Sequence, residues 1–423
     1  MPPPAATMPL RAARAPLFHG WKVVAVCLVA AVFAWGLGLF GSSVYLHALT
    51  ADRGWSVSLV SGAVTLFYLV NAALLPAVGS GIDRWGPRAV LAGGACAMAL
   101  GVAGLGFVTT PWQLYLAFAV MGLGWATLST TGLSATVAPW FERRQGQTIA
   151  IVLMGASVAG IVAVPLLLAG IERIGFRATV ALAGALAAAV LLPLILVLLR
   201  HRGPHSLGLL PDGAAAPAAP AASSPSPPAR RWTWAAAIRT PALQSVAAAF
   251  ALALLVQVGF LTHHVKIAEP MLGAAGAGLL VSATGLAALL GRFFLAAVAD
   301  RVRLRRLAAL MLALQILALA ALAALPVPAM LIAASLAFGF GVGNVTTLSP
   351  IIVRREFGAA AFGAIYGVAA TIIQVSLAFG PSVYGLLRDA FGSYGPVLAI
   401  AALLDVLALI LLLAGRHPPP PSA

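Results

Sequence analysis

The sequence predicts an all-α membrane protein of twelve transmembrane helices in two pseudo-symmetric six-helix bundles. Three observations predict this fold. Of the 423 residues, 62% are hydrophobic and 8% are charged, and the mean hydropathy is +1.03, far outside the range of soluble domains. The apolar residues form about twelve runs long enough for a hydrocarbon core of ~30 Å. The two halves of the chain also match each other at a constant offset.

The apolar runs give six expected spans on each side of a polar interruption. They lie at 22–46, 58–80, 89–109, 112–138, 147–170 and 178–199, then at 241–265, 273–299, 306–325, 328–352, 359–384 and 395–415. The first run is too long for a signal peptide and lacks a cleavage-site pattern, so it is expected to stay as a span.

Residues 200–240 separate the two sets of spans. They contain the run AAAPAAPAASSPSPPARR, which has no periodic apolar face and is typical of a flexible linker. The predicted organisation is therefore an N-terminal tail (1–21), a first bundle (22–199), a cytoplasmic linker (200–240), a second bundle (241–415) and a C-terminal tail (416–423).

The distribution of positive charge predicts the orientation. If both termini are cytoplasmic, the inside segments hold 19 Lys and Arg residues, and the outside loops hold Arg53, Arg173, Arg177, Lys266 and Arg388. This asymmetry obeys the positive-inside rule and predicts a multi-pass protein of the cell (inner) membrane with both termini cytoplasmic. The net charge of +15 is spread through short loops, which does not favour a nucleic-acid-binding face.

The two halves match at an offset of 217 residues. Matched pairs are Asp83 with Asp300, Arg84 with Arg301, Gly122 with Gly339, Gly124 with Gly341, Gly146 with Gly363 and Gly175 with Gly392. A constant offset across several loops predicts an internal duplication. Transporters built from two such parallel repeats bind their substrate near the bilayer midplane, between the halves.

One charge stands well inside an expected span. Arg292 lies in the apolar run from Gly276 to Val298, eight residues or about 12 Å from Asp300. An ionisable residue at membrane depth indicates a functional site, and a guanidinium fork matches a carboxylate. The repeat-equivalent of Arg292 is Leu75, so the fold does not require this charge. We expect Arg292 to bind a substrate anion; a structural contact and snorkelling to the interface are the alternatives.

Other polar residues within the spans are weaker candidates. Those that could line a substrate cavity, with helix packing as the alternative, are Tyr68, Asn71, Trp125, Thr127, Gln257, Asn344, Tyr366 and Gln374. His263 and His264, at the outer end of span seven, could serve proton coupling or could simply be solvated. Asp405, in span twelve, could serve coupling, but a structural hydrogen bond or an inward-turned carboxyl is the favoured expectation.

The loop between spans two and three carries a recognisable motif. Residues Gly79-Ser-Gly-Ile-Asp83-Arg84-Trp-Gly86-Pro-Arg88 resemble the G-x-x-x-D-R-x-G-R-R signature of the major facilitator superfamily, with Pro87 replacing one basic residue. The resemblance implies a gate latch formed by Gly79, Asp83, Arg84, Gly86 and Arg88 together with Asp300 and Arg301. An ordinary basic loop is the alternative.

A narrower resemblance covers almost the whole chain and concerns the monocarboxylate transporter family and its bacterial oxalate/formate exchanger-type relatives. The segments that carry it are Phe18-His-Gly-Trp21, Trp140-Phe-Glu-Arg-Arg144, Gly155-Ala-Ser-Val-Ala-Gly160, Gly203-Pro204, Leu207-Gly-Leu-Leu-Pro-Asp-Gly213 and Gly291-Arg292. Departures from the family pattern are His19, Leu39 and Ala288, and the absence of lysine from residues 359–384. The resemblance therefore implies an anion-binding role for Arg292 alone.

These observations predict a secondary transporter of small organic anions, either mono- or dicarboxylates. The expected partners are the anion, a coupling proton or counter-anion, and the lipid bilayer, and the protein is expected to be monomeric. Enzyme, nucleotide-binding and metal motifs are absent from the sequence, so no cofactor or metal is expected. Multidrug or amphiphile efflux and a non-transporting membrane sensor are the alternative functions.

Overall fold

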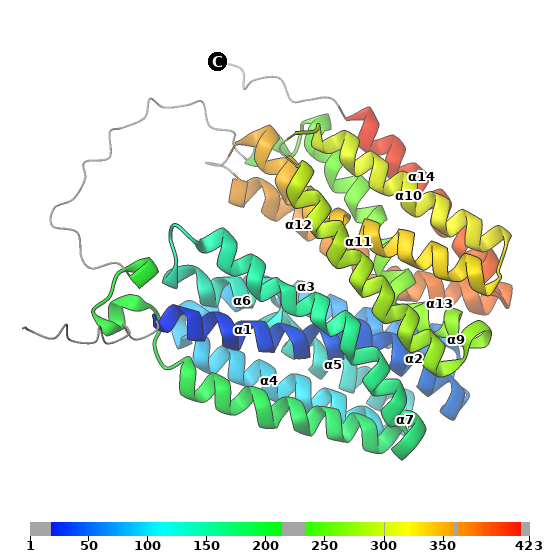
Figure 1. Cartoon of the computed structure of the whole chain (residues 1–423), viewed down its shortest axis with the longest axis horizontal. Coiled ribbons are helices and arrows are strands. Elements are labelled where there is room, and N and C mark those ends of the chain that lie inside the picture. The colour runs from blue at the N-terminus through cyan, green and yellow to red at the C-terminus, as the bar shows by residue number, and fades with distance from the viewer. Residues whose placement is uncertain (1–17, 214–233, 300, 359–361, 416–423) are drawn as a thin grey trace, which may run out of the picture.

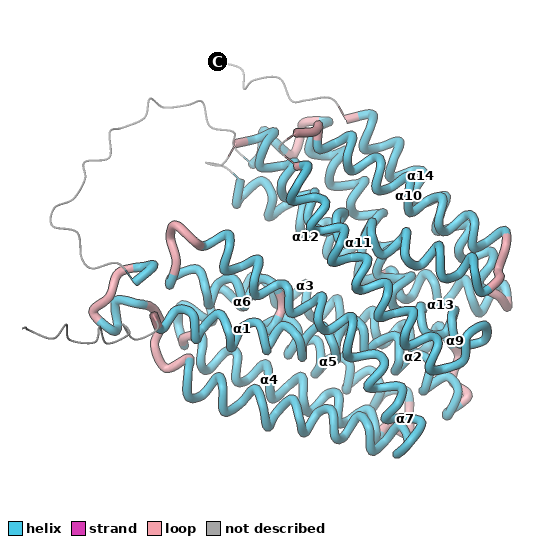
Figure 2. The backbone as a smooth tube through the Cα atoms, in the orientation of Figure 1, coloured by secondary structure: helices cyan, strands magenta, loops and turns pink. Residues whose placement is uncertain are grey.

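Every regular element that the structure describes is helical (Figure 2). The computed structural model describes residues 18–213, 234–299, 301–358 and 362–415. Ten helical segments within these ranges are long and apolar enough to cross a membrane.

In the first half, span one is a single rod of α1 (His19–Trp35), the π-helical turn η1 (Gly36–Phe40) and α2 (Gly41–Arg53). It is followed by α3 (Val57–Trp85), then α4 (Pro87–Gly104) with η2 (Leu105–Phe107). Span four joins α5 (Pro111–Leu128), α6 (Thr130–Val137) and η3 (Ala138–Trp140). The half ends with α7 (Gln145–Leu198).

In the second half, the short α8 (Trp234–Ala237) precedes α9 (Pro241–Val298). Three spans follow: α10 (Leu304–Ala324), α11 (Pro328–Phe357), and the rod of α12 (Phe362–Ala378) and α13 (Gly380–Phe391). The last span is α14 (Tyr394–Ala414).

The two longest helices are each two spans. In α7 the backbone is non-helical at Gly175 (φ 79°), and in α9 it is non-helical at Gly273 (φ 69°). These φ values lie in the left-handed region that glycine adopts without strain, so the chain turns back on itself at both positions. Counting each as two spans converts ten segments into twelve, which confirms the predicted fold class.

The spans pack as two bundles, one from α1–α7 and one from α9–α14 (Figure 1). Within the first bundle α1 packs on α7 and α4 packs on α5; within the second, α9 packs on α11 and α10 packs on α14. Contacts between the bundles involve mainly α7 with α9, α13 with α3, α12 with α3, and α2 with α9. We call the end of the molecule that carries residues 200–213 the linker side, and the opposite end the far side.

Residues 200–213, assigned by the sequence to a flexible linker, are ordered against the first bundle. They form the short turns η4 (Pro204–Leu207) and η5 (Pro211–Gly213). Arg202 donates to the backbone carbonyls of Asp83 (3.3 Å) and Arg84 (3.2 Å). The carboxylate of Asp212 accepts from the backbone N–H groups of Glu142 (3.0 Å) and Arg143 (2.8 Å).

This segment therefore ties together two loops of the first bundle, one between α3 and α4 and one between η3 and α7. Slight burial alone would raise the pKa of Asp212, but the backbone N–H groups and the charge of Arg144 hold it below its usual value. The rest of the predicted linker, residues 214–233, lies outside the described part of the chain.

Candidate functional site

The hydrogen bonds between the two bundles are concentrated toward the far side. Five pairs of residues make them there, and we call these pairs the far-side seam. They are Ser43 with Val265 N–H (2.9 Å), Thr50 with Lys266 (2.6 Å), Ser58 N–H with Asp389 (2.8 Å), Ser61 with His263 (3.2 Å) and Thr65 with Ser382 (2.7 Å). In Figure 1 the ribbons of the two bundles lie together at this end and diverge toward the linker side.

Arg292 lies where contact between the bundles ends. It projects from the second span of α9, is half-buried, and donates from Nη1 to Ser157 Oγ of α7 at 3.0 Å. Among the hydrogen bonds described between the bundles, none lies closer to the linker side than the one from Arg292 to Ser157. The guanidinium therefore points at a buried serine in mid-span rather than snorkelling to the membrane surface.

Arg292 has no carboxylate partner within 4 Å in the described ranges, where the one ion pair is Arg305 with Glu356. A guanidinium with one hydroxyl partner retains several free N–H donors, because it has five in all. Its positive charge is therefore available to an anion that reaches this point between the bundles.

Close packing of α7 on α9 continues from Arg292 toward the far side. A methyl group built on Gly285 would lie 3.1 Å from the carbonyl carbon of Gly160. Next to it, Ser282 Oγ donates to the Ile161 carbonyl at 2.6 Å. Arg292 thus marks the linker-side edge of a tight helix crossing.

Asn344 is the candidate residue that the structure places against Gly291, the residue before Arg292. It lies in α11, its Nδ2 donates to the Phe340 carbonyl at 2.8 Å, and Nδ2 is the side-chain atom that a methyl on Gly291 would meet. The other amide atom, Oδ1, is buried without a hydrogen-bond partner among the described residues.

Tyr68 and Trp125 are brought together inside the first bundle. They belong to an aromatic cluster with Trp35 and Phe67, in which the ring centroids of Trp35 and Trp125 are 5.0 Å apart. The Tyr68 hydroxyl is buried without a partner in the described structure. No interaction is described between this cluster and Arg292.

The remaining cavity candidates occupy separate places. Asn71 and Gln257 are buried, each with an amide oxygen that has no partner in the described ranges. Thr127 donates to the Gly124 carbonyl of its own helix and lies against Gly94. Tyr366 shares a hydrogen bond with Ser349 (3.2 Å), and Gln374 is half-buried on α12.

His263 and His264 are not solvated, in contrast to one of the sequence expectations. Both side chains are 0% exposed. His263 Nδ1 lies 2.9 Å from the Tyr394 hydroxyl, and its Nε2 lies 3.1 Å from the Pro381 carbonyl. His264 Nε2 lies 3.0 Å from Ser335 Oγ. They are buried because α9 continues as helix to the turn at Gly273, well beyond the expected end of span seven at residue 265.

Asp405 is turned inward, which is one of the two forms expected from the sequence; the other, a structural hydrogen bond, is not described. The side chain is 0% exposed, and neither carboxyl oxygen has a partner in the part of the chain that the structure describes.

The latch residues lie on the linker side. Gly79 is near the end of α3, and the chain turns at Gly86 (φ 87°). Asp83, Arg84 and Arg88 are exposed, as is Arg301 in the second bundle. Their side chains make no hydrogen bond or ion pair to the opposite bundle in the described structure. Asp300 lies outside the described residues.

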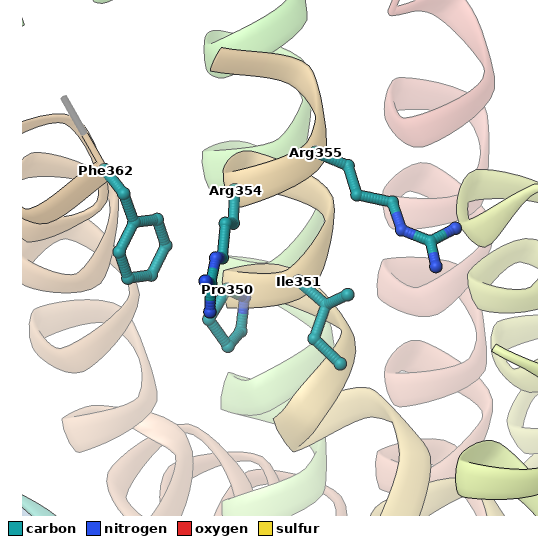
Figure 3. Close-up of a pocket in the computed structure, with 5 residues that line it drawn as sticks. All are labelled: Pro350, Ile351, Arg354, Arg355 and Phe362. Carbon is teal, nitrogen blue, oxygen red and sulfur yellow. The ribbon is translucent and has the colours of Figure 1, made fainter. Parts of the chain in front are cut away.

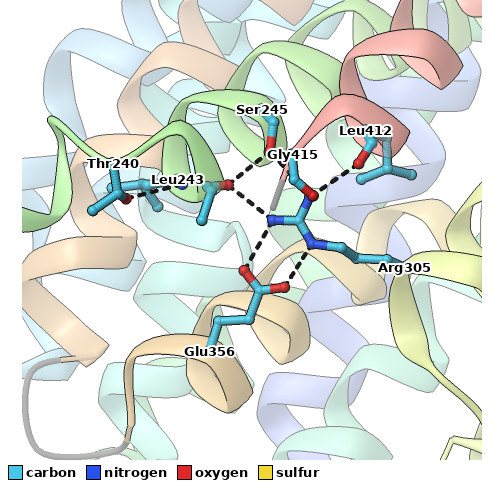
Figure 4. Close-up of polar contacts among 8 residues, drawn as sticks. Thr240, Leu243, Ser245, Arg305, Glu356, Leu412 and Gly415 are labelled. Atoms are coloured by element: carbon cyan, nitrogen blue, oxygen red, sulfur yellow. Dashed lines mark hydrogen bonds and ion pairs between the residues drawn. The ribbon is translucent and has the colours of Figure 1, made fainter. Parts of the chain in front are cut away.

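The sequence reasoning missed a polar cluster around Arg305 (Figure 4). Its Nε and Nη2 donate to the two carboxylate oxygens of Glu356 at 2.6 and 2.9 Å, and the guanidinium also reaches Ser245 Oγ and the carbonyls of Ala242, Leu412 and Gly415. This arginine ties together the linker-side ends of α9, α10, α11 and α14. The sequence offered one signal for a carboxylate partner of Arg305, because Glu356 and Asp300 are the two acidic residues at this end of the second half.

Two surface cavities lie away from Arg292. One, of about 420 Å³, is lined by Pro350, Ile351, Arg354, Arg355 and Phe362 (Figure 3). In Figure 3 Arg354 lies between Pro350 and Phe362, whereas Arg355 points away from them, so the two guanidiniums do not converge on one ligand position. The other, of about 860 Å³, lies at the far side of the first bundle, next to Phe107 and Arg177.

The family model described as Major Facilitator Superfamily matches residues 26–268 and 264–423. Human monocarboxylate transporter 11 is 26% identical over 402 residues, covering 89% of this chain and 78% of that protein. The fujikurins efflux protein of Gibberella fujikuroi is 30% identical over 128 residues, covering 30% of this chain and 26% of that protein.

Two solved structures share the fold at 14% identity. The D323A mutant of the nucleoside transporter NupG has a TM-score of 0.71, covering 94% of this chain and 99% of that one. A bacterial homolog of the human lysosomal transporter Spinster, in an inward-facing and unoccupied conformation, has a TM-score of 0.66, with 95% and 96% coverage.

Proposed function

Because this chain belongs to the major facilitator superfamily, we propose that it is a secondary active transporter that carries small organic anions, mono- or dicarboxylates, by alternating access. The chain is a multi-pass membrane transporter and not an enzyme. The substrate class, the coupling and the orientation are the proposed parts.

The observation that carries the anion proposal is the environment of Arg292. Its guanidinium lies between the bundles, where one serine is its described hydrogen-bond partner and no carboxylate in the described ranges neutralises it. A fixed positive charge away from bulk water attracts a carboxylate more strongly than a surface charge does. A carboxylate at this position would take up free N–H donors of the guanidinium in a planar pair.

The distribution of contacts supports a state that is open on the linker side. The far-side seam holds the bundles together, while the latch residues Asp83, Arg84, Arg88 and Arg301 are exposed. The excess of Lys and Arg on the linker side supports its assignment to the cytoplasm, with both termini on that side. In this assignment Arg292 faces the cytoplasm, and closure of the latch would turn it toward the outside.

Binding of a carboxylate would neutralise Arg292 and so favour closure of the carrier. An unpaired guanidinium is costly to enclose completely, and a bound carboxylate lowers that cost by neutralising it. The loaded carrier would therefore close over Arg292 more readily than the empty one. The coupling partner is either a proton or a second anion.

The test is uptake of a panel of radiolabelled mono- and dicarboxylates into proteoliposomes, with and without an imposed pH gradient. Arg292→Ala should abolish uptake because the anion loses its partner. Arg292→Lys should also impair it, because an ammonium keeps the charge but lacks the planar fork. Arg306→Ala, an exposed arginine in α10, is the matched control and should retain uptake.

Full carboxylate uptake by Arg292→Ala, or none by the wild type, would contradict the anion proposal. In the wild type, acceleration by an imposed acid-outside gradient would identify a proton as the coupling partner. Acceleration by internal anion alone would identify exchange.

A second candidate function is export of a larger amphiphilic molecule. It is favoured by the aromatic cluster of Trp35, Phe67, Tyr68 and Trp125, and by the similarity to a fungal efflux protein. Resistance to a hydrophobic compound that survives Arg292→Ala would support this function over carboxylate transport.

A further inference from the structure

Asp405 is the one acidic residue that the structure places deep within a span, among those in the described ranges. The chain has ten acidic residues, and the structure describes nine of them. The other eight described ones stand in turns, or within about one helical turn of the end of a span. Asp405 is eleven positions from the start of α14 and nine from its end, near the middle of the last span. Among the described acidic residues, it is therefore the candidate for binding and releasing a proton inside the membrane.

The surroundings of Asp405 favour its protonated form. Its side chain is 0% exposed in the second bundle, where α14 packs against α9, α10 and α13. Neither oxygen has a hydrogen-bond partner in the described ranges. A buried carboxylate without a donor or a counter-charge is strongly destabilised, which favours the neutral acid.

Tyr384 on α13 is the titratable neighbour of Asp405. Its helix packs against α14, and the Tyr384 hydroxyl is also buried without a partner among the described residues. A phenol can donate a hydrogen bond to a carboxylate, so a small movement would stabilise Asp405 after it loses its proton. From α10, the titratable side chains are Arg305 and Arg306, both at the linker-side end of that helix.

His263 on α9 belongs to the far-side seam and lies next to Tyr384. Its ring centroid is 5.6 Å from that of Tyr384. The Pro381 carbonyl can only accept, so Nε2 of His263 donates to it and Nδ1 accepts from the Tyr394 hydroxyl. Nε2 also lies 3.2 Å from Ser61 Oγ of the first bundle. The charged groups nearby are Lys266 on α9, and Asp389 and Arg388 on α13.

Opening of the seam would remove Ser61 from His263 and expose the histidine to water on the far side. We propose that Asp405 is a proton-binding site that exchanges its proton with the far side, through Tyr384 and His263, when the far-side seam opens. The proton comes from water on the far side: His263 takes it up at one ring nitrogen and gives up a proton from the other, Tyr384 gives up its hydroxyl proton and regains one, and the new O–H bond forms on a carboxylate oxygen of Asp405. The inference rests on the proposed function only in treating the far side as the outside.

Infrared spectroscopy of the full-length protein in lipid tests the site directly. At neutral pH the wild type should show the carbonyl stretching band of a protonated carboxyl group, and Asp405→Asn should lose it. Glu172→Gln, which removes an exposed carboxylate outside the seam, should keep the band. Asp405→Glu should keep a band at a shifted frequency, which serves as a second variant if Asp405→Asn does not fold. A wild type without the band, or a band unaffected by Asp405→Asn, would overturn the proposal.

The route and the coupling have separate readouts. His263→Phe should slow exchange of the carboxyl proton for deuterium; unchanged exchange would overturn the route. In proteoliposomes Asp405→Asn should lose substrate accumulation driven by a pH gradient but keep substrate exchange. Gradient-driven accumulation that persists in Asp405→Asn would overturn the coupling role. The infrared result requires no transport, so failure of carboxylate transport remains distinguishable from failure of this inference.

Discussion

Two half-buried arginines of the second bundle differ sharply in their partners. Arg305 is surrounded by a carboxylate, a hydroxyl and three backbone carbonyls, which together satisfy its charge and its donors. Arg292 has one serine as its described hydrogen-bond partner. A satisfied guanidinium stabilises the fold, whereas an unsatisfied one between the bundles is available to a ligand. We therefore assign a structural role to Arg305 and a binding role to Arg292.

Replacing Arg305 should destabilise the protein. Arg305→Ala removes the ion pair with the largely buried Glu356, and breaking a buried ion pair in this way costs about 3 kcal/mol. The thermal unfolding midpoint of the purified protein should fall clearly. Arg306→Ala, at the neighbouring exposed position, should leave the midpoint unchanged. Equal midpoints for the two variants would contradict the structural role of Arg305.

The residue-scale features that sequence predicts are those with a local signature. Arg292 could be identified because a charge in an apolar run stands out without reference to any other residue. The burial of His263 and His264 could not, because it depends on how far α9 extends and on α13 and α14 packing against it. The partners of Arg305 are 51 to 110 positions away in the chain, and no local pattern pairs them.

At the scale of elements, hydropathy located all twelve spans because each must cross the same apolar layer. Their ends were less predictable: α3 continues to Trp85, beyond the expected residue 80. Residues 200–213 were assigned to a flexible linker on composition. They are ordered by hydrogen bonds to loops that lie 69 to 119 positions away. The motif Leu207–Gly213 belongs to this ordered segment, so it has a structural role in bracing the first bundle.

The brace formed by Asp212 should weaken in acid. Because its pKa is lowered in the folded protein, its contribution to stability is present above the unfolded pKa of about 3.9 and is lost as pH falls through the folded value. Asp212→Asn should therefore unfold at a lower temperature than the wild type at neutral pH, and the difference should shrink below about pH 4.

Thermal unfolding across this pH range measures the effect of Asp212. Glu172→Gln, at an exposed position on the far side, should match the wild type throughout. A difference between Asp212→Asn and the wild type that grows in acid would refute the sign of the effect.

At the scale of the whole molecule, the two bundles are joined by hydrogen bonds on the far side and in mid-membrane, and the linker side has no described hydrogen bond between them. The sequence predicted two bundles from its internal repeat, because a duplication leaves matching residues such as Gly175 and Gly392, both of which have positive φ. It could not predict which side is closed. In the proposed alternating access the same chain adopts both states, and the contacts that distinguish them are long-range.

A disulfide across the seam should lock the transporter. Ser58 N–H lies 2.8 Å from the Asp389 carboxylate, so Ser58→Cys with Asp389→Cys, in a background without Cys27 and Cys96, should cross-link readily. The cross-link should stop transport, and reduction should restore it. Each single cysteine variant should transport with and without oxidant. Full transport by the cross-linked protein would mean that the seam does not need to open.

The most direct test of the central claim is equilibrium binding of carboxylates to the purified protein, with Arg306→Ala as the matched control. A charge-assisted hydrogen-bonded pair contributes enough free energy that Arg292→Ala should bind a transported carboxylate about 10- to 100-fold more weakly than the wild type. Wild-type affinity in Arg306→Ala together with that loss in Arg292→Ala is the predicted result. Equal affinities in the wild type and Arg292→Ala would contradict the account, because the anion would then bind elsewhere.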